Sequence, residues 1–174
     1  MKRRTWITAL VVVGAVGWYL FRPELLFVTT HVNEALPGES VAAAAETGSM
    51  GASAPTGETM PVVLLSGQFH SVHHETTGRA AVHEIGGQRL LRFTGFKTSN
   101  GPDVRVYLVA APDAADNESV TRAGFVELGE LKGTEGDQNY EIPAGLDLQK
   151  YRSVTIWCRR FSVNFATAPL TPAS

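Results

Sequence analysis

Cysteine is nearly absent from this chain: Cys158 is the only one among 174 residues. A single cysteine excludes an intramolecular disulfide. In an exported protein, such a residue is either a buried core residue, a partner for a cysteine of another chain, or a group used in redox or ligand chemistry. The choice among these roles is the main functional question that the sequence poses.

An excess of charge of either sign is also lacking. The chain has 15 Lys and Arg against 17 Asp and Glu, a formal net charge of −2. A nucleic-acid-binding domain carries a basic patch or stripe, commonly with interleaved aromatic residues. Neither is present, so we expect no nucleic-acid partner.

Common catalytic motifs are missing as well. The sequence contains no G-x-S-x-G elbow, no convincing Ser-His-Asp order and no glycine-rich phosphate loop ending in Lys-Ser/Thr. No pair of carboxylates has a spacing that demands acid–base work. The chain is therefore not expected to be a stand-alone enzyme.

Charged residues are absent from Thr5 to Phe21, a run that comes after Lys2, Arg3 and Arg4. A helix of this length spans about 25 Å, slightly less than a bilayer core of about 30 Å. Because no small-x-small cleavage site comes after it, the stretch 5–21 is predicted to be an uncleaved signal anchor, with a cleaved signal peptide as the alternative. The basic residues place the tail, residues 1–4, in the cytoplasm. The protein is thus expected to be a single-pass cell-membrane protein with a periplasmic or extracellular C-terminal domain.

Aromatic residues are absent between Phe27 and Phe69, where Ala, Gly, Ser, Thr and Glu predominate. Such a composition cannot bury enough apolar surface to offset the entropy lost on ordering. Residues 22–61 are therefore predicted to form a flexible linker.

Short strands dominate the remainder of the chain. Gly86-Gly87 separates two apolar runs and suits a tight hairpin, and further runs alternate with turns rich in Gly and Pro. The predicted fold is an all-β antiparallel sandwich over residues 62–170, followed by a C-terminal tail at 171–174. The predicted strands cover Arg79–Glu84, Gln88–Phe93, Val104–Val109, Phe125–Leu131, Asn139–Ile142, Val154–Cys158 and a strand containing Val163 and Phe165.

Alternation along these strands predicts the core. Cys158 shares a face with two β-branched residues, and Trp157 points to the opposite face. The change of parity after Cys158 requires a turn or bulge at Arg159-Arg160. The expected core residues are Leu91, Phe93, Val104, Val106, Leu108, Leu128, Val154, Ile156, Phe161, Val163 and Phe165.

The position of Cys158 is compatible with two environments. A side chain beside Val154 and Ile156 faces the core, where a thiol is an inert small hydrophobe. The residue also ends its strand next to Arg159 and Arg160, and cations there favour a reactive, partly accessible thiolate. Both alternatives stay open at this stage.

Four histidines are candidate metal ligands: His70, His73 and His74 form an H-x-x-H-H run, and His83 lies in the next predicted strand. Imidazole suits zinc, copper or haem iron. However, the run lacks the H-E-x-x-H pattern of a metalloprotease helix and is typical of a loop. A solvated loop is the favoured interpretation, and no metal site is assigned.

A series of motifs resembles one family. They are Gly67-x-Phe69, Asn100-Gly101-Pro102-Asp103 leading to Val106-Tyr107-Leu108, Leu128-Gly129-x-Leu131-Lys132-Gly133, Gly136-x-Gln138-x-Tyr140-x-Ile142-Pro143, Val154-x-Ile156-Trp157-Cys158 and Phe161-x-Val163-x-Phe165-x-x-Ala168. In order and number they resemble the DM13 domain, which is related to the DOMON β-sandwich modules. The resemblance implies an extracytoplasmic electron-transfer domain that works with a redox partner or another envelope protein. It also implies that Cys158 is a bare thiol or holds a prosthetic group such as haem.

Three further residues are supporting candidates for the site. Trp157 belongs to the Trp-Cys motif, and Arg159 comes directly after it. Asp103 ends the Asn-Gly-Pro-Asp turn, where its carboxylate is expected to accept hydrogen bonds from neighbouring backbone N–H groups.

The sequence thus leaves three hypotheses. The first is a redox module that uses Cys158. The second is a non-catalytic binding or adhesion module of the cell envelope, with Cys158 as a buried core residue. The third is a metal-binding protein that uses the histidines.

Overall fold

The computed structural model describes residues 29–38 and 60–173. Within these ranges the chain is mostly strand, with one short helix. The elements are β1 (His31–Asn33), β2 (Val62–Gln68), β3 (His70–Ser71), β4 (Thr77–Ile85), β5 (Gln88–Lys97), β6 (Val104–Val109), α3 (Asn117–Ala123), β7 (Phe125–Glu130), β8 (Glu135–Ile142), β9 (Ser153–Cys158), β10 (Val163–Pro169) and β11 (Thr171–Pro172).

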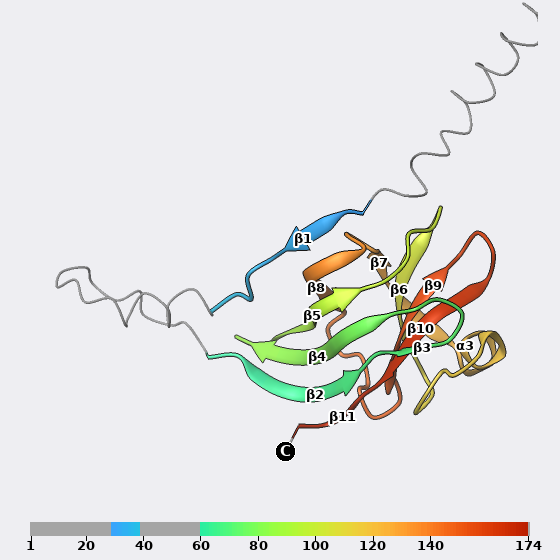
Figure 1. Ribbon diagram of the computed structural model, residues 1–174. Helices are drawn as coiled ribbons and strands as arrows, with labels where there is room; N and C mark the ends of the chain where they lie inside the picture. The colour runs from blue at the N-terminus through green and yellow to red at the C-terminus, as the bar shows by residue number, and fades with distance from the viewer. Residues whose placement is uncertain (1–28, 39–59, 174) are drawn as a thin grey trace, which may run out of the picture.

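Two sheets form the domain (Figure 1). The first has the strand order β1-β8-β5-β4-β2-β11, and the second has the order β3-β10-β9-β6-β7. All strand pairs are antiparallel except β1 with β8. The all-β, antiparallel character predicted from the sequence is therefore confirmed, in an arrangement consistent with a β-sandwich. The predicted anchor at residues 5–21 lies outside the described residues, among which no helix has the length and apolar character needed to cross a bilayer.

The predicted strands match the structure closely. The strand Val104–Val109 has the predicted bounds, whereas β5 and β8 are several residues longer than predicted. Gly86 and Gly87 form the turn of the β4–β5 hairpin with φ of 59° and 82°. These positive angles at both turn residues are those that a two-residue hairpin loop requires.

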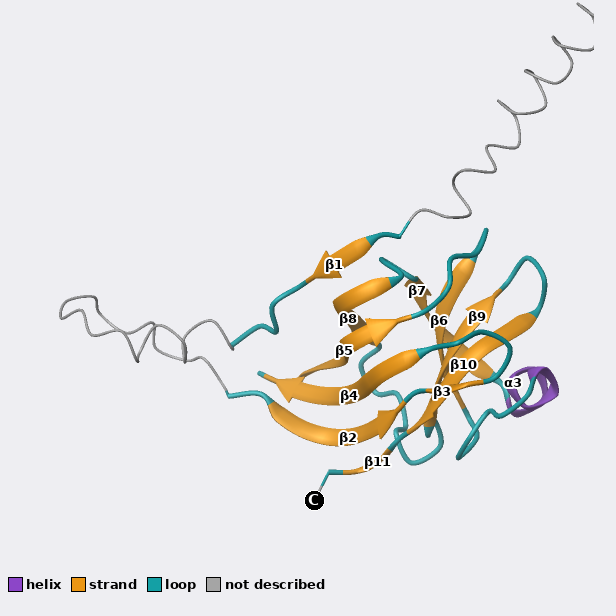
Figure 2. Cartoon of the chain, in the orientation of Figure 1, coloured by secondary structure: helices purple, strands orange, loops and turns teal. Residues whose placement is uncertain are grey.

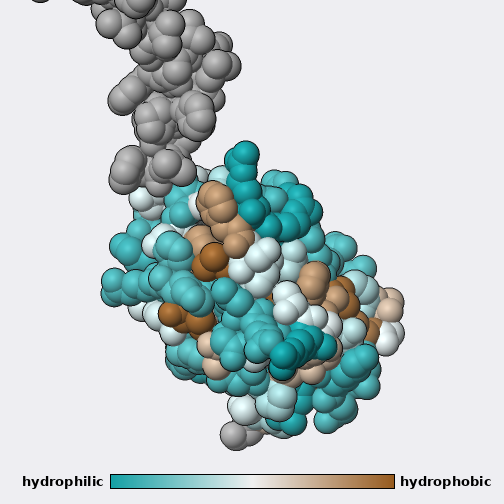
Figure 3. Space-filling model, turned by 90° about the vertical axis from the view of Figure 1, so that its right-hand side faces the viewer, coloured by the Kyte–Doolittle hydropathy of each residue, from teal (hydrophilic) through white to brown (hydrophobic). Residues whose placement is uncertain are grey.

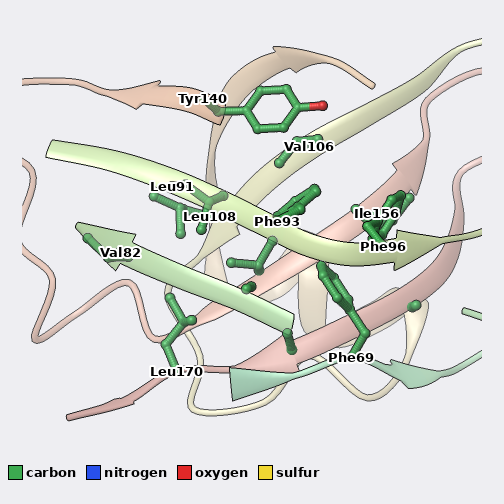
Figure 4. Close-up of a cluster of buried hydrophobic side chains, with 14 of the residues drawn as sticks. Phe69, Val82, Leu91, Phe93, Phe96, Val106, Leu108, Tyr140, Ile156 and Leu170 are labelled. Atoms are coloured by element: carbon green, nitrogen blue, oxygen red, sulfur yellow. The ribbon is translucent and has the colours of Figure 1, made fainter. Parts of the chain in front are cut away.

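The main core lies between the two sheets (Figure 4). It contains most of the predicted residues, and Leu128 and Val163 pack against it while partly exposed. Phe69 packs edge-on against Phe93 and Phe96, with ring centroids 5.1 and 5.2 Å apart. Such aromatic pairs each contribute about 0.5–1.5 kcal/mol beyond the burial of their surface.

A second, smaller core covers the outer face of the second sheet. Tyr107, Val109 and Trp157 project from the strands and meet Ala114 and Val120 of the segment that contains α3. Figure 2 shows this helix at the side of the second sheet, away from the first. The sheet is thus covered on both faces.

The short helix was not predicted from the sequence. It has seven residues and only Val120 is buried, so no helical periodicity marks it. The local signal is its N-cap: the carboxylate of Asp116 accepts a hydrogen bond from the backbone N–H of Ser119 at 2.6 Å.

One predicted core residue is wrong. Phe161 is 66% exposed, because it lies in the β9–β10 turn and not in β10. The turn covers residues 159–162 and has Ser162 at φ 53°, so the predicted turn at Arg159-Arg160 is present but is longer than expected. Alternation resumes only at Val163, and a bulge lies between Asn164 and Ala166.

Part of the predicted linker is also wrong. Residues 31–33 form β1, which pairs in parallel with β8. The carboxylate of Glu34 accepts hydrogen bonds from Lys132 Nζ and from the backbone N–H of Asn139, both at 2.7 Å. Leu36 is 5% exposed. This segment has little apolar surface, and it is ordered by hydrogen bonds and ion pairs that a sequence pattern does not reveal.

Two glycines make room for β1. A Cβ at Gly136, where φ is +102°, would lie 1.9 Å from the carbonyl oxygen of Val32, and a Cβ at Gly133 would lie 2.7 Å from that of Thr30. The absence of side chains at these positions therefore permits the close approach of the segment.

The predicted C-terminal tail likewise begins within the sheet. Thr171 and Pro172 form β11, which pairs with β2, and the preceding Leu170 is 1% exposed. The domain therefore extends past residue 170.

We expect Gly136→Ala to release β1, because the new methyl group would overlap the backbone of Val32. Hydrogen exchange should then accelerate at the backbone N–H of Glu34, which donates to Asp137, and at that of Glu135, which donates to Thr30. Gly129→Ala is the matched control: its φ is +141°, but no atom lies within 4 Å of the added Cβ. Equal protection of these amides in the two variants would contradict this account.

We also expect the docking of β1 to depend on pH. Burial raises the pKa of Glu34, but the hydrogen bonds from Lys132 and Asn139 outweigh it and lower the pKa below its ordinary value of 4.5. The Glu34 contribution is thus fully present above about pH 4.5 and is lost as the pH falls through the lowered pKa. Protection of the Glu34 amide should fall in this range.

The variant Glu34→Gln separates this effect from other carboxylates. Glu135, which contacts His31, also has a lowered pKa, owing first to its hydrogen bond with Lys97. The variant retains that contribution and should show a smaller loss of protection on acidification. An unchanged pH dependence would assign the effect to Glu135 instead.

Candidate functional site

Cys158 is the last residue of β9 and is 0% exposed. Its backbone pairs with Val104 of β6 on one side and with Val163 of β10 on the other. The side chain belongs to the main core together with Val154 and Ile156, as alternation predicted. The free thiol is therefore inside the sandwich, and the folded domain does not present the accessible thiol that was the other expectation.

Trp157 lies on the opposite face of β9, also as predicted, and is 5% exposed in the smaller core. It lies beside Tyr107, with ring centroids 6.3 Å apart, and Tyr107 stacks on Phe125 at 4.2 Å with ring planes 2° apart. Burial raises the pKa of the Tyr107 hydroxyl. The three rings extend from beneath the helix segment to the surface, where Phe125 is 43% exposed.

A network of charges lies outside the core at the same end of β9. The Asp103 carboxylate accepts hydrogen bonds from Arg105 Nε at 2.6 Å and from Arg159 Nε at 2.9 Å. Arg105 also contacts Glu127 and Glu130, at 3.2 and 2.9 Å. The hydrogen bond from Arg105 is the main reason that the pKa of Asp103 is lowered.

The expectation for Asp103 is thereby corrected. Its carboxylate is held by two guanidinium groups and not by neighbouring backbone N–H groups. The backbone carbonyl of Asp103 also contacts Arg159: it accepts a hydrogen bond from the Arg159 N–H at 2.9 Å. Since Arg159 is already paired with Asp103 and Glu127, it is not free to stabilise a thiolate at Cys158.

A pocket of about 610 Å³ opens beside this network. Its wall includes residues of several sequence motifs, brought together from separate turns. A Cβ at Gly101 would lie 2.8 Å from Val104 and 3.0 Å from Phe165, so glycine lets this turn pack directly on the core. The lining residues are Thr30, Asn100, Gly101, Pro102, Asp103, Val104, Arg105, Glu130, Leu131, Lys132, Gly133, Thr134, Arg159 and Arg160.

Cys158 does not line this pocket. Its cross-strand neighbour Val104 does line the pocket. Side chains directly opposite each other in an antiparallel pair are about 5 Å apart at Cβ. The thiol and the pocket are therefore near each other at the same end of β9.

A buried glutamine supports the pocket wall, and sequence analysis missed this role. Gln138 is 0% exposed; its amide donates to the carbonyl of Gly133 at 2.8 Å and accepts from the Gly133 N–H at 3.1 Å. Its Oε1 also accepts from the Tyr140 hydroxyl at 2.7 Å, which in turn accepts from the Lys132 N–H. Burial raises the pKa of Tyr140. The sequence feature that could have indicated this role was a polar Gln in an otherwise half-buried strand.

The histidines do not converge. His70 contacts Asp113 at 3.1 Å, His73 Nδ1 lies 2.9 Å from the carbonyl oxygen of Asn164, and His74 packs against the ring of Phe165. Burial, together with the smaller effect of the charge of His73, lowers the pKa of His74. His83 lies in β4, in the other sheet. Within residues 29–38 and 60–173, no three His, Cys, Asp or Glu side chains are grouped so that they could hold a metal ion.

One comparison with known proteins gives a match. The model of the family described as Electron transfer DM13 matches residues 68–170, more than half of the chain. No curated protein and no solved structure matches significantly. The match begins at Gln68, the last residue of β2, and ends at Leu170. It covers the second sheet, the motifs around the pocket and strands β4, β5 and β8 of the first sheet, but not β1, β11 or most of β2. On this basis the chain belongs to the DM13 electron-transfer family.

Proposed function

We propose that this chain is a membrane-anchored, extracytoplasmic electron-transfer module in which Cys158 is the redox-active group, acting as a bare thiol. The observation that carries the proposal is the position of the sole cysteine. It ends the buried strand β9, opposite Val104, which lines a pocket built from the turns of the family motifs. The family description supplies the electron-transfer role, and the N-terminal sequence supplies the anchor.

A thiolate-bound haem does not fit this arrangement. The Cys158 side chain is packed among apolar groups of the core and does not line the pocket beside the Asp103 network. That pocket is lined by no His, Met, Cys or Tyr, the side chains that ligate haem iron. We therefore assign no step to haem, and in this proposal Cys158 acts as a bare thiol.

The surroundings of the thiol determine how it would act. Oxidation by a one-electron acceptor, such as a partner protein with an oxidised metal centre, removes one electron and one proton from the S–H group and leaves a thiyl radical. One electron from a reduced partner and one proton from water then restore the thiol. In the described part of the chain, the buried polar side chains are those of Thr, Ser, Asn and Gln residues, so no buried carboxylate or imidazole can take the proton that oxidation releases. It must reach water, and hence the reaction requires a transient opening at the pocket end of the sandwich.

Complete burial also favours a second candidate, a non-catalytic binding or adhesion module of the cell envelope. In that case Cys158 is a core residue and the pocket, with its charged rim, binds a ligand or partner. The two candidates differ in one respect: only the first requires the sulfur atom.

The stability of two variants tests the burial of Cys158. Cys158→Ala removes the sulfur from a packed site and should destabilise the domain by about 1 kcal/mol. Cys158→Ser places a hydroxyl among apolar side chains and should cost about 1–3 kcal/mol. Urea denaturation of both variants should thus show serine to be the worse replacement, whereas a neutral serine variant would indicate a solvated site.

Thiol chemistry tests the function. In the folded chain, Cys158 should react with a maleimide slowly, at a rate that is set by opening and is therefore independent of reagent concentration when the reagent is in excess. The reduced chain should transfer one electron to ferricyanide per Cys158, and the Cys158→Ala variant should transfer none. A folded chain whose thiol reacts only after denaturation, and which gives no electron to ferricyanide, would establish the binding module instead.

A further inference from the structure

The β9–β10 turn exposes an apolar side chain between polar neighbours. Phe161 is 66% exposed at the tip, and it comes directly after Arg159 and Arg160. Ser162, next in the chain, has φ 53°, an angle that a non-glycine residue seldom adopts. Segments that rest in the headgroup region of a bilayer combine apolar or aromatic side chains with Lys or Arg.

The position of β1 brings this turn close to the predicted anchor. Thr30 lines the same pocket as Arg159 and Arg160, so the start of β1 and the turn lie at one end of the domain. Between Phe21, the last residue of the predicted anchor, and Thr30 there are only residues 22–29. Even fully extended, this stretch reaches about 30 Å. Without β1 docked, all of residues 22–61 would separate the anchor from the domain.

The charges at this end suit an anionic surface. Four cations line the pocket against two carboxylates, Asp103 and Glu130. Arg105 and Arg159 are paired with Asp103, and Lys132 with Glu34. Arg160 is exposed and forms no ion pair with any residue in the described ranges, which leaves it available for a phosphate group.

The exposed apolar area around the β9–β10 turn is small. Figure 3 views the side of the molecule on which the β9–β10 turn lies in Figure 1, and this side is mostly hydrophilic with separate, small hydrophobic patches. A stable protein interface buries a much larger area, about 800 Å² on each partner. A single aromatic tip with adjacent cations is better suited to a shallow contact with lipid headgroups than to a second copy of the chain.

We propose that the β9–β10 turn, through Arg160 and Phe161, contacts the outer surface of the membrane that holds the anchor, with docked β1 keeping the pocket end close to the lipid. This inference rests on the anchor of the proposed function but not on the chemistry of Cys158. It implies that the pocket faces a partner within or upon the membrane.

Fluorescence quenching by lipids tests which end of the domain faces the membrane. The full chain, in a Cys158→Ala background, is placed in vesicles that contain anionic lipid, and a fluorophore is attached at Ser162→Cys or at Lys150→Cys. Both positions are exposed, but position 150 is near the opposite end of the domain, where the Arg152 N–H donates to Val109 at the far end of β6 from Val104. Nitroxide lipids should quench the probe at 162 several-fold more than the probe at 150.

Three variants test which residues cause the difference in quenching between the two probes. The double change Arg160→Gln with Phe161→Ser should abolish the difference between the two probes. Phe125→Ser, which removes an exposed aromatic residue opposite Val109, should leave it unchanged. Gly136→Ala, which displaces β1, should reduce it. Quenching that is equal at 162 and 150 in the unmodified tip overturns the proposal.

The experiment can disprove the membrane anchor and the orientation of the domain separately. A chain that stays with the vesicles through an alkaline carbonate wash but shows equal quenching overturns the orientation and leaves the anchor intact. A chain that the wash removes overturns the anchor, and the orientation with it.

Discussion

Strand β9 is buried along its whole length, and the rest of the structure depends on this burial. It is the middle strand of the second sheet, paired with β6 and β10, and all six residues from Ser153 to Cys158 are buried. One face requires the first sheet as a cover, and the other requires the segment around α3. The two cores, the position of the helix and the opposite surroundings of Trp157 and Cys158 all result from a strand with no solvent-exposed face.

The same strand separates two kinds of chemistry at its end. Inside lies an uncharged thiol among apolar side chains. Outside lies a network in which Asp103, Arg105 and Arg159 satisfy one another, with Glu127 and Glu130 at its edge. Since the guanidinium groups are engaged with carboxylates, they hold the turns in place. The network therefore connects the turn at Asp103 with the β9–β10 turn and with β7.

Strand β1 extends the family domain with a segment from outside the matched region. It adds no large apolar side chain to the main core and is held by backbone pairing, by Glu34 and by the space at Gly133 and Gly136. Such a contact has few buried apolar groups and is expected to open more readily than the sheets. Its importance is geometric, because it determines which end of the domain lies nearest to the preceding segment.

The sequence by itself determined the β architecture, most strand positions and the opposite faces of Trp157 and Cys158, because these result from a period of two along a strand. Motifs also selected Asp103, Trp157, Cys158 and Arg159, which do lie at one end of the sandwich. Only the tertiary structure decided the partners: the pairing of Asp103 with two arginines, the support from Gln138, the docking of β1, the exposure of Phe161 and the full burial of Cys158. Each of these depends on a residue or turn supplied from a distant part of the chain, and a local pattern carries no information about what will be placed against it.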